Sequence, residues 1–324
     1  MASTDNETDL IALIAANQLQ QPDTDNLILG IGDDAAIIRV SENYDLVSCT
    51  DTLVAGVHFP LQTSAYDIGW KSLAVNISDL AAMAATPRFA QLALTLPTAD
   101  INWLREFLAG WQALASEYNI GLIGGDTTRG PLSITVQAMG EIPQGQALLR
   151  GRAKLGDVLV VSGDLGSAAR ALQQLQAGEA MDSELALELN RPQPRVALGQ
   201  ALHGLASSAI DLSDGLALDA QRLMAGSGLG AKIQLQQLPL KSTLAALSQS
   251  QRYSLAVSGG DDYELLFTLP AELQNRLAEI SSAANISLTV IGEIQANPVV
   301  ELLADDGGLF TPSFKAYEHF NENR

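Results

Sequence analysis

The chain contains few of the residues that build disulfides, zinc sites or nucleic-acid-binding surfaces. Its 324 residues include 1 cysteine and 3 histidines, so an internal disulfide is impossible and a structural zinc site is disfavoured. The 18 Lys and Arg residues stand against 37 Asp and Glu residues, which gives a formal net charge of −19. A chain this acidic repels phosphate backbones, so broad nucleic-acid binding is disfavoured, whereas its carboxylates suit hard cations.

Long apolar runs and leader-like segments are missing as well. No apolar run approaches the roughly 20 residues that span a bilayer. The segment from Met1 to Asp9 is acidic and polar, which predicts no signal peptide. The lone cysteine, Cys49, fits a reducing compartment. We therefore expect a soluble cytoplasmic protein that has no membrane and no nucleic-acid partner.

Several nucleotide-binding and catalytic motifs are also absent. The chain has no Gly-x-x-x-x-Gly-Lys-Ser/Thr, which excludes a P-loop enzyme. No Gly-x-Gly-x-x-Gly opens a βαβ unit, so a Rossmann dinucleotide site is unsupported. Neither a Gly-x-Ser-x-Gly elbow nor the protein-kinase catalytic motifs occur. Any chemistry must therefore reside in another pattern.

Helical and strand patterns intermingle along the chain, which indicates an α/β class. Apolar residues from Trp103 to Leu114 recur at helical spacing, whereas Leu92, Leu94 and Leu96 alternate as in a strand. Near residues 142–152 the composition changes to Pro, Gly, Gln and Arg, which predicts two domains, 1–147 and 148–324. The expected helices are 67–85, 103–114, 196–205, 216–224 and 271–283, and the expected strands are 45–51, 92–96, 132–136, 158–161, 209–210, 255–257, 265–269 and 288–291.

Aspartates recur beside Gly or Ser at the ends of apolar runs. One such site is usually a turn or a cap, because Asp is a good turn residue, but a series of them is harder to dismiss. If several of these turns met, two carboxylates 4 Å apart would repel by roughly 4 kcal/mol at an effective dielectric constant of 20. Oxygen-only ligands favour several Mg²⁺ ions with a polyphosphate. The aspartates are Asp33, Asp34, Asp51, Asp79, Asp126, Asp211, Asp214, Asp261 and Asp262.

Glycines accompany these acids. The pairs Gly124-Gly125 and Gly259-Gly260 allow a backbone to approach a ligand closely. Residues 163–166, which are Gly-Asp-Leu-Gly before a predicted helix, form either an anion cradle or an ordinary strand-to-helix turn.

Six motifs carry a resemblance to a known family. They are residues 30–36 (GIGDDAA), 50–59 (TDTLVAGVHF), 73–83 (LAVNISDLAAM), 122–130 (LIGGDTTRG), 208–215 (SAIDLSDG) and 258–265 (SGGDDYEL). In this order they resemble the thiamine-monophosphate kinase family of the aminoimidazole-ribotide synthetase superfamily, from about Gly30 to Phe320. The resemblance implies a two-domain PurM-like α/β fold with an α+β C-terminal layer domain. It also implies that the N-terminal sheet pairs with that of a second copy into a barrel, which makes a homodimer.

The resemblance further implies the reaction and the residues that serve it. ATP and thiamine monophosphate would give ADP and thiamine diphosphate. The acceptor is an anionic phosphate oxygen that needs no general base, so we expect direct in-line transfer driven by metal ions and positioning, with no catalytic side chain. The implied Mg²⁺ positions are Asp34, Cys49 (through its backbone at most), Thr50, Asp51, Asp79, Asp126, Asp211 and Asp214; those for ATP are Gly125, Asp126, Arg150 and Ser213; those for the thiamine substrate are His58, Asp261 and Tyr317.

Structural alternatives remain open for individual residues. Asp79 could be an exposed acid, Arg150 a surface residue or a salt-bridge partner, and His58 a packed core histidine. Tyr317 could pack a tail, and Cys49 could be a small core residue. For the whole chain, the rivals are another superfamily enzyme, such as selenophosphate synthetase or a hydrogenase-maturation protein, and a non-catalytic acidic metal-binding protein. Both rival enzymes are disfavoured because the chain lacks the terminal cysteines that they would need.

Overall fold

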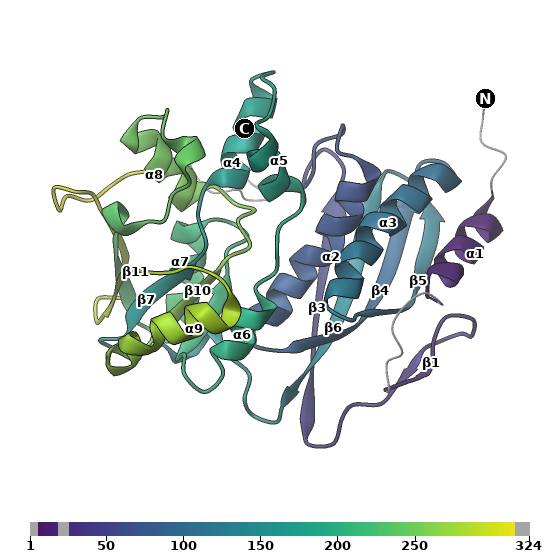
Figure 1. The fold of residues 1–324 in the computed structure, drawn as a ribbon, viewed down its shortest axis with the longest axis horizontal. Coiled ribbons are helices and arrows are strands. Elements are labelled where there is room, and N and C mark those ends of the chain that lie inside the picture. The colour runs from purple at the N-terminus through teal and green to yellow at the C-terminus, as the bar shows by residue number, and fades with distance from the viewer. Residues whose placement is uncertain (1–5, 19–25, 315–324) are drawn as a thin grey trace. The chain divides into compact units, whose positions relative to one another are not determined.

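The structure is a computed structural model that describes residues 6–18 and 26–314 (Figure 1). The chain divides into two compact units. Unit 1 comprises Met1–Leu80 and Ala85–Gly145, and unit 2 comprises Ala81–Ala84 and Gln146–Arg324. Each unit combines helices with a mixed sheet, so the predicted α/β class is confirmed.

Unit 1 is built on the four-stranded sheet β3-β6-β4-β5, in which only β4 and β5 are parallel. Along β3, Val47 and Leu53 are buried, whereas Ser48 and Thr52 are exposed. This alternation gives the sheet one face against the core and one open face. The elements are α1 (Glu7–Gln18), β1 (Leu27–Leu29), β2 (Ile37–Ile38), β3 (Tyr44–Val54), α2 (Ala65–Ala82), β4 (Thr86–Leu96), α3 (Ile101–Glu117), β5 (Gly121–Arg129) and β6 (Ser133–Pro143).

Helices α2 and α3 cross where two glycines meet. Helix α3 begins at Asp100, whose carboxylate accepts N–H groups of the first turn, and its apolar residues such as Trp111 are buried. At the crossing, a Cβ on Gly110 would lie 2.7 Å from the carbonyl carbon of Tyr66, and a Cβ on Gly69 would overlap the backbone of Phe107. The absence of side chains at both positions therefore sets the distance between the two helices.

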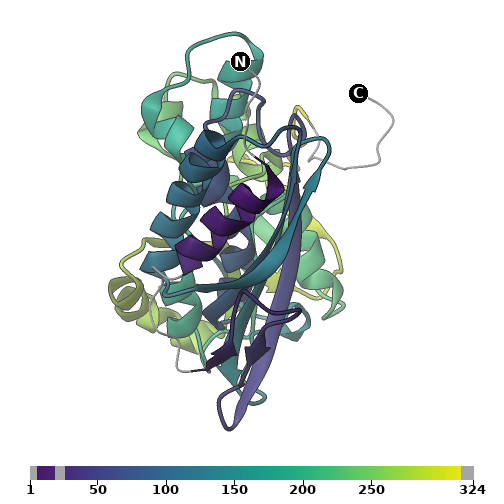
Figure 2. The ribbon, with the colours of Figure 1, turned by 90° about the vertical axis from the view of Figure 1, so that its right-hand side faces the viewer.

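The hairpin β1–β2 lies next to the sheet and is fixed at its base (Figure 2). Glu141 of β6, 2% exposed, accepts the N–H and the hydroxyl of Ser41, each at 2.8 Å, and the side-chain amide of Asn26 at 3.3 Å. Arg88 lies 3.5 Å from the same carboxylate. Glu141 therefore joins both ends of the segment whose turn carries Asp33 and Asp34.

Unit 2 contains the six-stranded mixed sheet β12-β9-β11-β7-β10-β8. Its core is made by apolar side chains of these strands with those of α7 and α8. The elements are η1 (Arg150–Arg152), β7 (Val158–Ser162), α4 (Ser167–Gln176), α5 (Ser183–Asn190), α6 (Val196–Ala201), β8 (Ser208–Asp211), α7 (Leu216–Ala225), β9 (Gly230–Gln234), η2 (Leu235–Gln237), η3 (Ser242–Leu244), α8 (Gln249–Ser258), β10 (Leu265–Leu269), η4 (Ala271–Arg276), α9 (Leu277–Ala284), β11 (Leu288–Gln295) and β12 (Val300–Leu303).

Three loops of unit 2 converge where strands β7 and β8 end and strand β10 begins. Strand β10 runs antiparallel to both β7 and β8, and Leu265 at its start is paired with Asp211 at the end of β8. Strand β7 ends next to the same position, at Ser162, whose hydroxyl accepts the N–H of Leu265 at 2.9 Å. The loops 163–166, 212–215 and 259–264 therefore leave the sheet side by side.

Two predictions of local structure are wrong. Residues 255–257 belong to helix α8 rather than to a strand, because Ser248 and Gln251 form a capping box that starts a helix through them. The expectation that Asp126 lies in a turn fails because it lies within β5, whereas Asp51 lies in the expected strand, which continues past it to Val54. Strong pairing with neighbouring strands outweighs the low strand propensity of Asp at these positions.

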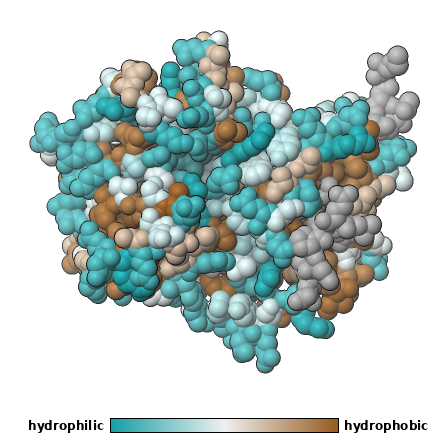
Figure 3. Space-filling view, viewed as in Figure 1, coloured by the Kyte–Doolittle hydropathy of each residue, from teal (hydrophilic) through white to brown (hydrophobic). Residues whose placement is uncertain are grey.

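None of the helices within residues 6–18 and 26–314 is long and apolar enough to cross a membrane. The face shown in Figure 3 is mostly hydrophilic, with scattered apolar patches.

Candidate functional site

Strand β3 carries three of the predicted metal-binding positions, and its alternation separates them. Asp51 and Cys49 are half-buried and lie against Asn76 of α2, which is fully buried. The Asn76 side-chain oxygen accepts the N–H of Asp51 at 3.1 Å, and the Cys49 thiol donates to the Asn76 carbonyl at 3.2 Å. Thr50 is exposed on the other face. An ion bound by Asp51 can therefore take Thr50 only through its main-chain carbonyl.

Asp126 lies on the edge of the unit 1 sheet opposite to Asp51. Strands β6 and β4 lie between β3 and β5, and at about 4.8 Å per step the two backbones are roughly 14 Å apart. The register aligns Asp126 with Ala93 and Thr135, whereas Asp51 aligns with Val136 in the adjacent row. Because residues in one row share a face, the two carboxylates also lie on opposite faces. A single chain therefore does not bring these two side chains to one ion.

Three further predicted residues of unit 1 have different surroundings. Asp34 is exposed in the turn of the hairpin, where its N–H donates to Asp33 at 2.8 Å. Asp79 is half-buried on α2, so it is not a fully exposed acid. His58 is half-buried, and its Nδ1 accepts the N–H of Val54 at 2.9 Å. The neutral imidazole therefore carries its proton on Nε2, which can donate to an anionic acceptor.

In unit 2, the loop after β8 is fixed by an acid of helix α7. Asp219, 1% exposed, accepts the N–H groups of Asp214 at 3.0 Å and Gly215 at 3.1 Å. Arg222 donates to Asp219 at 2.7 Å and forms an ion pair with Asp214. Burial raises the pKa of the Asp219 carboxyl, although the N–H of Asp214 and the Arg222 cation oppose the shift. This network sets the backbone of the loop that follows the buried Asp211.

Residues 259–264 lie against that loop along their backbone. The N–H of Asp261 donates to the Ser213 carbonyl at 3.0 Å, and the N–H of Tyr263 donates to the Leu212 carbonyl at 2.8 Å. A Cβ on Gly260 would lie 2.5 Å from the Ser213 oxygen, so this approach requires glycine. Asp261 and Tyr263 have φ angles of 68° and 48°. Such left-handed conformations cost about 1–3 kcal/mol for residues other than glycine, and they cluster at ligand sites.

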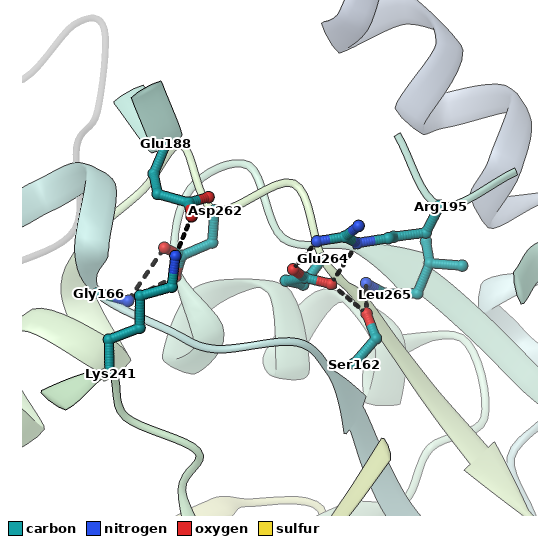
Figure 4. A network of polar contacts seen from close by, with 8 residues as sticks. All are labelled: Ser162, Gly166, Glu188, Arg195, Lys241, Asp262, Glu264 and Leu265. Carbon is teal, nitrogen blue, oxygen red and sulfur yellow. Dashed lines mark hydrogen bonds and ion pairs between the residues drawn. The ribbon is translucent and has the colours of Figure 1, made fainter. Parts of the chain in front are cut away.

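Figure 4 shows how Glu264 is held at the start of β10. Its carboxylate, 4% exposed as a residue, accepts both the Nε of Arg195 at 2.7 Å and a terminal nitrogen of the same guanidinium. The hydroxyl of Ser162 also donates to it. A Cβ on Gly163 would overlap this carboxylate. Glu264 therefore joins the ends of β7 and β10 to the segment that precedes α6.

Asp262 accepts at the beginning of helix α4. The Gly166 N–H donates to its carboxylate, with oxygens at 3.0 and 3.1 Å, and the Lys241–Glu188 ion pair lies beside it (Figure 4). The pKa of the Asp262 carboxyl lies well above its ordinary value, mainly because of burial; the Gly166 N–H opposes the shift, and nearby carboxylates, Glu264 first, add to it. The N-terminus of α4, considered above as an anion cradle, is thus used by a carboxylate of the chain itself.

Helix α7 connects two of the predicted ATP positions. The loop with Ser213 precedes its N-terminus, and Gly226 directly after it packs against Gly151. Arg150, the neighbour of Gly151, is exposed. The placement of Arg150 and that of Ser213 therefore depend on the same helix.

The donor atoms fit Mg²⁺ only if phosphates complete its shell. Residues 6–18 and 26–314 contain no group of three His, Cys, Asp or Glu side chains that could hold a metal ion. Mg²⁺ in proteins usually takes one or two carboxylates and fills the remaining positions with water and substrate phosphates. Apart from Cys49, the predicted side-chain donors are oxygens, as this cation requires. The set therefore suits an ion shared with a ligand rather than a complete protein cage.

The structure groups most of the predicted residues of unit 2 and separates those of unit 1. Asp211 ends strand β8, and Ser213, Asp214 and Asp261 lie in the two adjoining loops. Arg150 lies near the other end of α7, and Tyr317 lies outside the described residues. Local sequence patterns did not indicate the residues that hold these positions. Only the position of Glu264 within the 258–265 motif could have indicated one of them. The missed residues are Asn76, Glu141, Arg195, Asp219, Arg222 and Glu264.

Comparisons with known proteins cover most of the chain. Residues 32–142 match the family model "AIR synthase related protein, N-terminal domain", and residues 154–305 match "AIR synthase related protein, C-terminal domain". A thiamine-monophosphate kinase of Haemophilus influenzae is 41% identical over 93% of this chain and 94% of its own length.

Two solved structures are similar to both units. The thiamine-monophosphate kinase of Stenotrophomonas maltophilia is 45% identical, covers 93% of this chain and 96% of its own, and superposes with a TM-score of 0.85. AaThiL in complex with AMPPCP and TMP is 29% identical, covers 97% of each chain and has a TM-score of 0.76.

Proposed function

The chain belongs to the thiamine-monophosphate kinase family, within the AIR synthase related proteins, and from this premise we propose how its residues serve the reaction. It is an ATP-dependent kinase that converts thiamine monophosphate into thiamine diphosphate. Its fold is the two-domain PurM-like α/β fold with mixed sheets. The similarity to solved kinase structures over nine-tenths of the chain carries this conclusion.

The reaction brings two polyanions together, and this sets what the protein must do. The acceptor oxygen of thiamine monophosphate is already anionic, so no side chain has to remove a proton from it. The chain must instead hold the acceptor in line with the γ-phosphate and offset the repulsion between the phosphates. No catalytic side chain and no phosphoenzyme are proposed. A mechanism based on positioning and bound cations fits a chain with 37 Asp and Glu residues, because carboxylates are suitable ligands for hard cations.

We assign the Mg²⁺ positions to acids of both units. Mg²⁺ would offset the negative charge of the phosphates when bound. In unit 1 the acids lie on strands β3 and β5, on helix α2 and in the hairpin turn. In unit 2, Asp219 and Arg222 set the orientation of Asp214. The assigned positions are Asp34, the backbone of Cys49, Thr50, Asp51, Asp79, Asp126, Asp211 and Asp214.

ATP is assigned to Gly125, Asp126, Arg150 and Ser213. Gly125 has a φ angle of 154°, and a Cβ there would overlap the carbonyl oxygen of Leu92, so this position requires glycine and presents only backbone to a ligand. The exposed Arg150 supplies a cation for a phosphate. The hydroxyl of Ser213 supplies a hydrogen-bonding group in the loop ordered by Asp219.

Thiamine monophosphate is assigned to His58, Asp261 and Tyr317. The Nε2–H of His58 can donate to the substrate phosphate. The thiazolium ring of thiamine carries a permanent positive charge, which the carboxylate of Asp261 complements. Tyr317 lies outside the described residues, and its assignment stays a prediction.

A homodimer closed through the unit 1 sheets explains the separation of Asp51 from Asp126. These residues lie on β3 and β5, the two edge strands of the sheet. A barrel of two four-stranded sheets places β3 of one copy beside β5 of the other and leaves no free edges. The open face, with Thr52 and Thr135 joined at 2.8 Å beside Thr50 and Gln137, suits the interior of such a barrel. Such a dimer would put Asp51 of one copy on the strand next to Asp126 of the other, and we propose that the two carboxylates, although they leave opposite faces, serve one metal site at this strand boundary.

The roles of the two domains and the cellular location are proposed from the sequence alone. We propose 1–147 as the dimerisation and metal-binding domain and 148–324 as the domain that adds ATP-binding and substrate-binding residues. A cytoplasmic location stays a prediction that rests on the single cysteine.

Product formation tests the function. The purified protein is incubated with ATP and thiamine monophosphate, with and without Mg²⁺, and ADP and thiamine diphosphate are measured by chromatography. We expect both products only with Mg²⁺. In the folded variants Asp51→Asn, Asp126→Asn and Asp211→Asn we expect no turnover; retained activity in all three would refute the metal assignment. ADP without thiamine diphosphate would favour another superfamily enzyme, and Mg²⁺ binding without ADP would favour a non-catalytic protein.

A further inference from the structure

We propose that Asp262 and Glu264 are positioning residues that hold Asp261 in the orientation required to bind the thiamine part of the substrate. The inference rests on the substrate role proposed for Asp261. It concerns two carboxylates, the half-buried Asp262 and the buried Glu264, next to the one assigned to the ligand. Neither is proposed to touch the substrate.

Backbone and side-chain contacts alternate along residues 261–264. Asp261 and Tyr263 have left-handed backbones, and their N–H groups donate to the carbonyls of Ser213 and Leu212. Asp262, between these two residues, and Glu264, directly after them, direct their carboxylates to two different anchors (Figure 4). The backbone is therefore held on one side by the neighbouring loop and on the other by two acids.

The first anchor is the N-terminus of α4. Both oxygens of Asp262 lie within 3.1 Å of the Gly166 nitrogen, where the partial positive charge of the helix end favours an anion. Gly166 has a φ angle of 84° and begins the helix. This contact ties the residue directly after Asp261 to a helix of ten residues.

The second anchor is Arg195. Its guanidinium contacts Glu264 through two nitrogens, and Ser162 donates to the same carboxylate. The planar fork of arginine fixes both the position and the rotation of a carboxylate. Gly163 leaves the space that Glu264 fills. The end of the segment is thereby fixed to strand β7.

Together the two anchors hold a backbone that would otherwise relax. The φ angle of a residue sets the direction of its Cα–Cβ bond. Relaxation of the left-handed conformation at Asp261 would therefore turn its carboxylate away from the orientation proposed for binding thiamine. Loss of either anchor should therefore weaken binding of thiamine monophosphate more than binding of ATP. A purely structural role would affect both substrates through stability.

The test uses near-isosteric variants of the full-length protein. Asp262→Asn and Glu264→Gln remove the charge but keep the size of each anchor. Asp261→Asn is the reference, and Glu279→Gln is the control, because Glu279 forms an exposed ion pair with Arg276 in the same unit. The KM for thiamine monophosphate, the KM for ATP and kcat are measured, with urea denaturation of each variant.

We expect each anchor variant to raise the KM for thiamine monophosphate about tenfold, with the KM for ATP and kcat within about twofold of the parent. The control should change none of these. The KM for thiamine monophosphate of the double variant Asp261→Asn/Asp262→Asn should exceed that of Asp261→Asn by less than about twofold, because both changes act through the same carboxylate.

Other outcomes would overturn the inference. If Asp261→Asn has no effect on the KM for thiamine monophosphate, the substrate role of Asp261 fails and the inference fails with it. Suppose that Asp261→Asn raises the KM for thiamine monophosphate but neither folded anchor variant does, or that the two changes in the double variant multiply their effects on this KM. Then only the inference fails. Should Asp262→Asn not fold, Glu264→Gln decides by the same criteria; unfolding of both would make these acids determinants of stability instead.

Discussion

Substitution of Gly110 by alanine should change stability in two opposite ways, through helix propensity and through a steric clash. Glycine in a helix interior is less favourable than alanine by about 1 kcal/mol, so propensity alone predicts a gain in stability. The structure predicts a loss, because the new Cβ would lie 2.7 Å from the Tyr66 carbonyl carbon and closer to its oxygen. Carbon atoms pack at about 3.5–4.0 Å, so α2 and α3 would have to separate by about 1 Å.

The steric effect should exceed the gain in propensity. Overpacking a core costs about 1–3 kcal/mol and sometimes more, and a clash between two helix backbones belongs at the upper end of that range. We therefore expect Gly110→Ala to lower the free energy of unfolding by about 2 kcal/mol and the melting temperature by roughly 4–8 °C. Turnover should fall too, since α2 carries Asn76 and Asp79.

Urea denaturation and thermal melting measure these changes. Ala109→Gly is the matched control, because Ala109 is exposed on the same helix turn and its substitution reports propensity alone, with an expected loss of about 1 kcal/mol. A Gly110→Ala variant as stable as the parent, or more stable, would refute the reasoning about this helix crossing.

Three other predictions follow from single contacts. Asn76→Ala leaves the N–H of Asp51 without its acceptor and should lower the free energy of unfolding by about 1–3 kcal/mol; a change below about 0.5 kcal/mol in urea titrations would contradict the role of Asn76. The pKa of Asp262 in the folded state lies well above the ordinary 3.8, so between these two values the folded state binds more protons than the unfolded state and stability falls as pH rises. Asp262→Asn should flatten urea midpoints measured across that pH window, and an unchanged pH dependence would argue against the shift. Glu141→Gln weakens the attachment of Asn26 and Ser41, so amide hydrogen exchange in residues 27–38 should quicken; equal exchange rates would mean that apolar packing alone holds the hairpin.

Sequence patterns sufficed for elements with strong periodicity. The alternating Leu92, Leu94 and Leu96 lie in β4, and the helical spacing from Trp103 to Leu114 lies in α3. Both signals arise because one face of each element is buried. Gly and Asp at 212–215 and 259–264 mark loops, as expected of these turn residues.

The failures have physical causes. Leu255 to Val257 is too short a run to distinguish a strand from a helix; the deciding signal is the capping box of Ser248 and Gln251, several residues earlier. Asp126 lies inside β5 because pairing with β4 fixes its backbone.

The supporting residues of the site could not be predicted from local patterns. Asp262 meets Gly166 and Glu264 meets Arg195 over separations of 96 and 69 residues. Contacts of this kind depend on the order of strands in the sheet. The order β3-β6-β4-β5, which separates Asp51 from Asp126, has no local signature in the sequence either.

The most direct test of a metal site completed by two chains is complementation between inactive variants. Asp51→Asn and Asp126→Asn proteins are mixed, allowed to exchange subunits, and assayed for thiamine diphosphate, with native mass spectrometry to verify heterodimers. If each site takes Asp51 from one chain and Asp126 from the other, a heterodimer keeps one intact site, and random exchange should restore about one quarter of parental activity. Verified heterodimers without any recovered activity would contradict the account.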